Sequence, residues 1–189
     1  ATHDYVEQRH MTHFNVFGAA PTGHGMAEWH NALQGLAAST RLGIPVTLST
    51  DPRHSFSENP GAAIFAGPFS QWPETLGLAA IRDEELVEQF GDIARQEYLA
   101  VGIRVALHPQ IDLATEPRWA RQLATFGEDA DLTGRLGAAY IRGFQGAALG
   151  PDSVATMTKH FPGGGPQLDG EDPHFEYGRE QVYPGGEFE

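Results

Sequence analysis

The sequence predicts an α/β fold built on a parallel sheet, because strand-like and helix-like runs alternate along its 189 residues. Glycines close two of the helix-like runs, and polar or charged residues follow three of the strand-like runs. Parallel α/β folds bind ligands at the carboxyl ends of their strands. The predicted strands cover residues 12–18, 44–50, 103–109 and 153–160, and the predicted helices cover residues 26–40, 84–101 and 131–149.

The first helix-like run places Met26, Trp29 and Leu33 at helical spacing, and Gly43 ends it before the apolar strand 44–50. The second begins after Asp83, whose short carboxylate suits a helix N-cap, and ends at Gly102, which suits a C-cap. Its apolar face comprises Leu86, Val87, Phe90, Ile93, Ala94 and Tyr98.

The third helix-like run carries an apolar face with Leu132, Leu136, Tyr140 and Phe144, although its four glycines lower its helix propensity. The last strand, residues 153–160, has a weaker alternating pattern than the others. No internal repeat or second domain is apparent, and the length suits one domain.

The composition excludes several classes of function. A net charge of -13 with only 12 scattered Lys and Arg argues against a nucleic-acid surface. No apolar run reaches the roughly 20 residues that cross a membrane, and the first ten residues do not resemble a signal peptide. The absence of cysteine excludes disulfides, thiolate metal sites and a cysteine nucleophile.

Polar side chains follow three of the predicted strands. Asp51 and His54 follow the second, residues 112–121 follow the third, and Lys159 with His160 ends the fourth. Because the carboxyl ends of parallel strands meet at one edge of the sheet, these groups predict a binding pocket there.

Each group also has a purely structural interpretation. An aspartate after a strand often caps a turn, and residues 116–129 could equally begin an exposed helix with weak Arg–acid pairs. Lys159 and His160 could form a solvated strand end. The glycine-rich loop after them lacks the phosphate-binding pattern and carries acids, which disfavours a phosphate site.

Histidines near the N-terminus raise the alternative of a metal site. His10 and His13 are one helical turn apart, but the stretch "HMTHFNVFG" favours a strand, in which their side chains would point to opposite faces. No acid or cysteine beside them completes a ligand set. No metal site is therefore expected.

Three stretches together resemble glycoside hydrolase family 3, in particular exo-acting β-glucosidases and β-glucan exohydrolases. They are "STRLGIPVTLSTDPRHS", "EPRWARQLATFGEDADLTGRLGAAYIRGFQG" and "TKHFPGGGPQLDGEDPH", in the family's order and spacing. The resemblance extends from about Met11 to the last residue. It implies a parallel (β/α) barrel of TIM type, with residues 1–189 as roughly its N-terminal half and no second domain.

The resemblance implies a retaining enzyme that hydrolyses non-reducing terminal β-D-glucosyl residues without a cofactor. In the family the nucleophile follows a later strand, in a stretch like "SDW" that this sequence lacks. The nucleophile and the acid/base are therefore expected outside this chain, and no catalytic residue within it. The family also suggests a secreted or periplasmic location.

The resemblance also implies the sugar-binding residues. Asp51, Arg121, Lys159 and His160 match the family's residues in the −1 subsite, where a carboxylate accepts from vicinal hydroxyls and the cations donate to others. His54 is expected to support the loop after Asp51. The full expected set of substrate-binding residues is Asp51, His54, Arg121, Lys159, His160, Asp169 and His174, with Asp169 and His174 on the pocket wall and Glu171 and Asp172 unassigned.

The expected substrate is a β-linked oligosaccharide or an aryl β-glucoside. Half of a closed barrel exposes strand edges and an apolar face, so the remaining half is expected as another chain or a nicked segment. The alternative is a non-catalytic carbohydrate-binding module, or an inactive fragment of such an enzyme, that uses the same residues.

Overall fold

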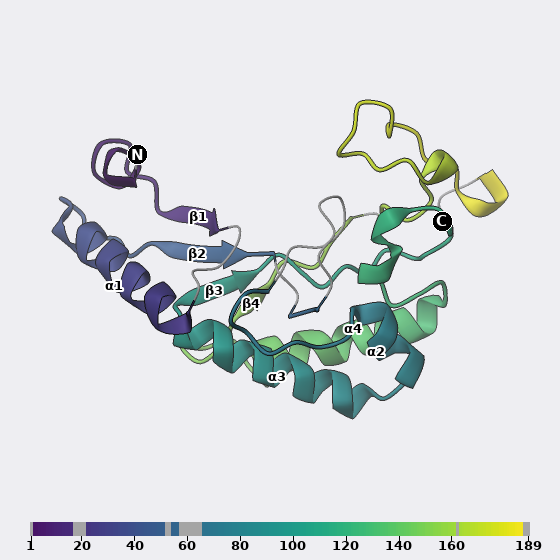
Figure 1. Cartoon of the computed structure of the whole chain (residues 1–189), viewed down its shortest axis with the longest axis horizontal. Coiled ribbons are helices and arrows are strands. Elements are labelled where there is room, and N and C mark those ends of the chain that lie inside the picture. The colour runs from purple at the N-terminus through teal and green to yellow at the C-terminus, as the bar shows by residue number, and fades with distance from the viewer. Residues whose placement is uncertain (1, 17–21, 52–53, 57–65, 162, 187–189) are drawn as a thin grey trace.

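The computed structural model describes residues 2–16, 22–51, 54–56, 66–161 and 163–186. Its centre is one four-stranded sheet in the order β1-β2-β3-β4, with every neighbouring pair parallel (Figure 1). The predicted parallel α/β fold is confirmed, while residues 17 and 18 of the first predicted strand lie outside the described residues. The strands are β1 (His13–Val16), β2 (Thr47–Thr50), β3 (Ile103–Ala106) and β4 (Ala155–Thr156).

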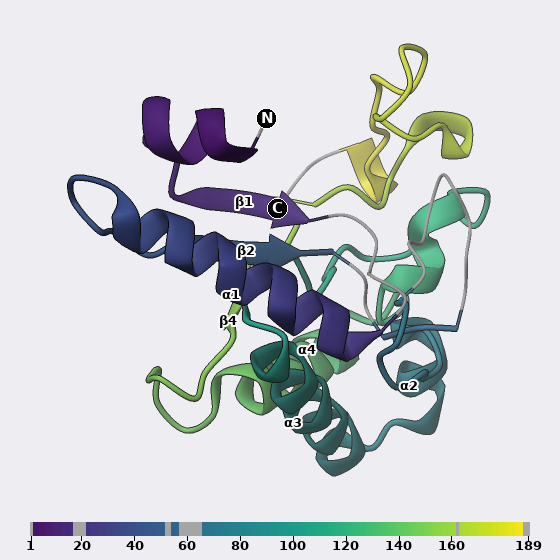
Figure 2. The same ribbon diagram turned by 60° about the vertical axis from the view of Figure 1, so that its left-hand side comes forward.

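The helices that connect the strands lie together on one face of the sheet, as Figures 1 and 2 show. All three predicted helices are confirmed, and α2 and the short helical turns η1 to η4 were not predicted. The α-helices are α1 (Gly23–Ser39), α2 (Thr75–Ile81), α3 (Glu84–Ala100) and α4 (Ala130–Gln145). The short turns are η1 (Asp4–Gln8), η2 (Ala120–Ala124), η3 (Leu168–Gly170) and η4 (Pro184–Gly186).

Side-chain caps fix where the long helices begin. The carboxylate of Asp83 accepts a hydrogen bond from the backbone of Leu86 at 3.1 Å, as its N-cap position predicted. Asp129 caps α4 in the same way through the backbone of Leu132, at 2.9 Å. At the other end of α3, Gly102 follows the C-cap residue with φ of +86°, a conformation that favours glycine.

The larger core lies between β3 and the helices α3 and α4. Phe90, Tyr98, Tyr140 and Phe144 pack there ring against ring, and each is almost completely buried. His108, which follows β3, lies among them, with one ring nitrogen 3.1 Å from the Tyr98 hydroxyl and the other 2.6 Å from the Tyr140 hydroxyl. The end of β3 is therefore locked into the core.

Two glycines allow α3 and α4 to touch along their backbones. A Cβ at Gly143 would lie 2.4 Å from the carbonyl oxygen of Glu88, and one at Gly91 would lie 2.9 Å from that of Tyr140. Glycine lowers helix propensity, but here it permits a close crossing that larger residues would prevent. This packing explains why a glycine-containing segment is nonetheless a helix.

The far end of the described sheet is less well covered. β4 has only two residues, and the segment after it exposes 55% of Met157 and 99% of Phe161. A smaller core at the other edge joins η1 to α1 and β2 through Val6, Leu33, Ala37, Val46 and Leu48. None of the helices within the described ranges combines the length and apolar character that a membrane crossing requires.

Candidate sugar-binding site

The site lies where the chain leaves β2, β3 and β4, at the strands' carboxyl ends. Asp51 follows β2 directly, and its carboxylate accepts a hydrogen bond from the Lys159 ammonium at 2.9 Å. Lys159 is held by the main chain: its N–H donates to the carbonyl of Pro109 at 3.0 Å, and its carbonyl accepts from Ile111 at 2.7 Å. The pairing of β3 with β4 thus continues as far as Lys159, and Lys159 and Asp51, two predicted site residues, lie side by side.

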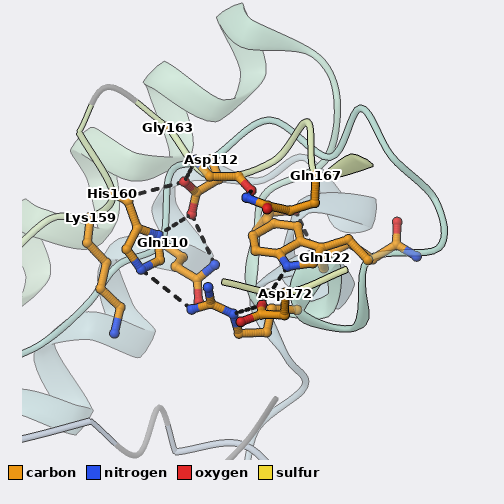
Figure 3. Close-up of polar contacts among 12 residues, drawn as sticks. Gln110, Asp112, Gln122, Lys159, His160, Gly163, Gln167 and Asp172 are labelled. Atoms are coloured by element: carbon orange, nitrogen blue, oxygen red, sulfur yellow. Dashed lines mark hydrogen bonds and ion pairs between the residues drawn. The ribbon is translucent and has the colours of Figure 1, made fainter. Parts of the chain in front are cut away.

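Asp112 is a buried carboxylate at the centre of the site (Figure 3). One of its oxygens lies 2.9 Å from His160 Nδ1 and accepts from Gln110 Nε2 at 3.0 Å. The other accepts from the backbone N–H of Gly164 and, at 3.4 Å, from that of His160. Burial disfavours the charged form, but the hydrogen bonds, led by that from His160, hold the pKa of Asp112 below its ordinary value.

Asp172 is a second buried carboxylate with a different set of donors. Its Oδ2 accepts from Trp119 Nε1 at 2.7 Å and from Arg121 Nε at 2.6 Å. Its Oδ1 accepts from the backbone of His174 at 3.0 Å and lies 2.6 Å from that residue's Nδ1. Burial opposes ionisation, but hydrogen bonds from His174, Arg121 and Trp119 outweigh it and lower the pKa of Asp172 to about 2.

The two buried carboxylates are linked through the side chains they hold. The guanidinium Nη1 of Arg121 lies 3.5 Å from Nε2 of His160, and the guanidinium carbon lies 5.2 Å from the centre of the Trp119 ring. Asp112 therefore orients the imidazole and Asp172 orients the guanidinium. A carboxylate, an ammonium, an imidazole and a guanidinium can together bind several hydroxyl groups of one sugar ring.

His54 was expected among the substrate-binding residues as a support for the loop after Asp51, and the structure buries it too deeply to contact a sugar. Its imidazole is completely buried, stacks on Phe69 at 4.9 Å, and has Nε2 2.9 Å from a carboxylate oxygen of Glu97 on α3. Its carbonyl accepts from the backbone of Trp72 at 2.7 Å. His54 thus ties its own segment to residues 70–72 and α3, while residues 52 and 53 lie outside the described residues.

Asp169 and His174 both lie on the surface, and their expected place on a pocket wall stays a prediction. Asp169 is an exposed residue whose carboxylate accepts from Arg118 at 3.0 Å. His174 is exposed and contacts Oδ1 of Asp172, whereas Arg121 contacts Oδ2. The contact with His174 stabilises the Asp172 carboxylate. The structural interpretation of residues 116–129 as an exposed helix start is also wrong, since Trp119 is fully buried and Arg121 nearly so.

Sequence reasoning missed the groups that hold the site in place. Asp112 was noted only as part of a strand-end segment, and Asp172 was left unassigned. The signal for Asp112 was its position a few residues after the third strand, the same kind of position that identified Asp51. No signal separated Asp172 from its acidic neighbours. Within the described residues, no group of three or more His, Asp or Glu could hold a metal ion.

The comparisons with known proteins agree on one family. The family model "Glycosyl hydrolase family 3 N terminal domain" matches residues 4–182. Beta-glucosidase C of Emericella nidulans is 59% identical over 186 residues, which is 98% of this chain and 30% of that protein. The chain thus spans less than a third of the length of this curated relative.

Two solved structures share the fold. A family 3 β-N-acetylglucosaminidase from Paenibacillus is 27% identical with a TM-score of 0.77, over 92% of this chain and 31% of that one. A mutant β-glucosidase from Listeria innocua in complex with laminaribiose is 28% identical with a TM-score of 0.66, over 84% of this chain and 20% of that one.

Proposed function

The chain belongs to glycoside hydrolase family 3, and we propose on this premise that it forms the sugar-binding half of a β-glucosidase barrel. The complete enzyme would remove β-D-glucosyl residues from the non-reducing end of an oligosaccharide or from an aryl β-glucoside, with retention of configuration. The chain would supply the −1 subsite through Asp51, Arg121, Lys159 and His160. The names of the relatives and the laminaribiose complex support this substrate class.

The observation that carries the proposal is the convergence of these four side chains at the carboxyl ends of the strands. Lys159 and Asp51 are each about one-fifth exposed, so both keep a face toward solvent while they pair with each other. The side chain of His160 is 35% exposed, although its Nδ1 is engaged by Asp112. These exposed faces are what a sugar would contact.

The acids within the site favour a nucleophile and an acid/base outside residues 1–189. Asp112 and Asp172 are buried and fully occupied by donors. Asp51 is paired with Lys159, and this pairing suits a carboxylate that accepts hydrogen bonds from sugar hydroxyls. A retaining glycosidase needs two carboxyl groups roughly 5 Å apart on either side of the scissile bond. We expect both from strands outside residues 1–189.

The exposed side of β4 supports completion of the barrel by further strands. Among the described residues β4 is the last strand of the sheet, and Met157 and Phe161 beside it are exposed; proteins normally cover such an edge. The rest of the barrel would come from strands outside residues 1–189. Residues 1–189 would then be the N-terminal portion of a single barrel domain.

The test is hydrolysis of p-nitrophenyl β-D-glucoside by the whole protein that contains residues 1–189, followed by proton NMR of the first sugar released. We expect the first sugar released, before mutarotation, to be β-glucose. An Asp51→Asn variant should lose activity through weaker glucosyl binding, whereas Asp92→Asn, on the outer helix α3, should not. Release of α-glucose, or no turnover with retained glucose binding, would contradict the proposal and favour a binding module.

A further inference from the structure

We propose that Asp112 is a positioning residue that fixes the tautomer and the orientation of His160, and so makes His160 Nε2 a hydrogen-bond acceptor for the bound sugar. This inference rests on the proposed function, in which the exposed edge of His160 contacts the sugar. It assigns the imidazole a role opposite to that of its neighbours Lys159 and Arg121, which can only donate.

The charge of Asp112 determines whether His160 Nδ1 carries a hydrogen. An ionised carboxylate only accepts hydrogen bonds, and the depressed pKa of Asp112 keeps it ionised at neutral pH. Its Oδ2 lies 2.9 Å from His160 Nδ1. Nδ1 therefore carries a hydrogen, because the other tautomer would place two lone pairs against each other.

Nε2 lies on the other side of the His160 ring and faces Arg121. Its neighbour at 3.5 Å is Nη1 of Arg121, a group that has donors and no acceptor. A neutral ring with hydrogen on Nδ1 presents its Nε2 lone pair to that guanidinium. The same lone pair can accept a hydrogen bond from a sugar hydroxyl that enters beside Arg121.

Asp112 also fixes the orientation of the His160 ring. Asp112 also accepts from the backbone N–H groups of His160 and Gly164. The same carboxylate thus fixes the ring, the residue that bears it and the loop that follows. A carboxylate behind a histidine sets both the tautomer and the ring angle in other enzymes, and its replacement by an amide gives the wrong tautomer.

The direct test is long-range proton–nitrogen NMR of the whole protein labelled with ¹⁵N-histidine. His160→Ala identifies the His160 signals by their loss. We expect a protonated Nδ1 and a bare Nε2 at pH 8, and we expect Asp112→Asn to move the hydrogen to Nε2, since the new amide can donate to Nδ1. A protonated Nε2 in the unaltered protein would overturn the inference even if no Asp112 variant folds.

A double-mutant cycle separates positioning from a merely structural role. We expect Asp112→Asn to weaken isofagomine binding about 10- to 100-fold, and to weaken it far less in the His160→Ala background. An equal loss in both backgrounds would mean that Asp112 only shapes the loop. Asp129→Asn, a conservative change at the α4 N-cap, should leave binding unchanged. If the unaltered protein does not bind isofagomine, the proposed function fails, whereas the NMR result still decides the tautomer.

Discussion

Two arginine–aspartate pairs join the same two segments of the chain, and they differ strongly in burial. Arg118 and Asp169 are 3.0 Å apart, with side chains 61% and 63% exposed. Arg121 and Asp172 are 2.6 Å apart, with side chains 8% and 5% exposed. In each segment, the buried residue lies three positions after the exposed one.

The comparison shows that burial, rather than residue type, separates the pair at the proposed sugar site from the surface pair. An exposed pair is screened by water and stabilises little. A buried pair loses hydration, but Trp119 and His174 supply further donors to Asp172, so that each charge is satisfied. The buried pair also places Arg121 beside His160, which connects it to the proposed sugar site.

The largest effect is expected from Asp172→Ala. Removal of this carboxylate leaves the Arg121 charge and the Trp119 N–H buried without an acceptor, which costs about 3–5 kcal/mol of unfolding free energy. Urea denaturation of the whole protein measures this loss. Asp169→Asn is the control, because asparagine removes the exposed charge and tolerates the φ of +55° at this position, and it should leave the urea midpoint unchanged. Equal shifts in the two variants would contradict the distinction between the pairs.

A third pair, Lys159 and Asp51, sharpens the comparison because its burial is intermediate, at 21% and 22% exposed. Lys159→Met should remove a charge-assisted hydrogen bond to substrate worth about 1.5–3 kcal/mol, roughly a 10- to 100-fold loss in kcat/KM. Its effect on the urea midpoint should be small. Arg135→Met, in an exposed pair with Glu84, is the control. A large loss of stability with intact kcat/KM would make Lys159 structural.

Lowering the pH should reduce the stability that the buried Arg121–Asp172 pair contributes. Asp172 has a pKa of about 2 in the folded protein against an ordinary value of 3.8, so its contribution to stability is complete above about pH 4 and is lost as the pH falls toward 2. The contribution is on the order of 2 kcal/mol. Unfolding free energies at pH 4.5 and 2.5 should therefore fall less steeply in Asp172→Asn than in the unaltered protein. Parallel slopes would contradict the ion pair.

The smallest effect is expected from the exposed pair. Arg118→Ala should leave kcat/KM and the urea midpoint unchanged, although Arg118 lowers the pKa of Glu116 to about 2 through hydrogen bonds. Arg118 and Asp169 are 61% and 63% exposed, so solvent screens their interaction, and the Glu116 carboxylate, at 16% exposed, keeps contact with water when Arg118 is removed. A stability loss that approaches that of Asp172→Ala would show that exposure is a poor guide here.

Much of the fold could be predicted because hydrophobic periodicity records which face of each element is buried. The apolar faces of α3 and α4 and the N-cap at Asp83 follow from local sequence, except that Ile93, predicted on the apolar face of α3, is 38% exposed. Helix α2 was missed because its seven residues follow a segment rich in glycine and proline and carry a weak pattern. The close approach of Gly91 to α4 depends on a second helix and has no local signature.

The site was only partly predictable, because burial of a polar side chain depends on distant segments. Asp169 and Asp172 lie three residues apart in one acidic loop, but only Asp172 meets Arg121 and Trp119, which lie 51 and 53 residues earlier in the chain. His54 was chosen for its proximity to Asp51 in sequence, whereas its ring packs into the aromatic core. The strand-end rule located Asp51, Lys159 and His160 because it rests on topology.

The most direct test of the central claim is to trap the glycosyl-enzyme with 2,4-dinitrophenyl 2-deoxy-2-fluoro-β-D-glucoside. The whole protein is then denatured and digested, and the labelled peptide is identified by mass spectrometry. We expect the adduct on a carboxylate outside residues 1–189, with labelling slowed by Asp51→Asn or Lys159→Met. An adduct on Asp51, Asp169 or any other residue of this chain would contradict the claim that it supplies sugar binding and not the nucleophile.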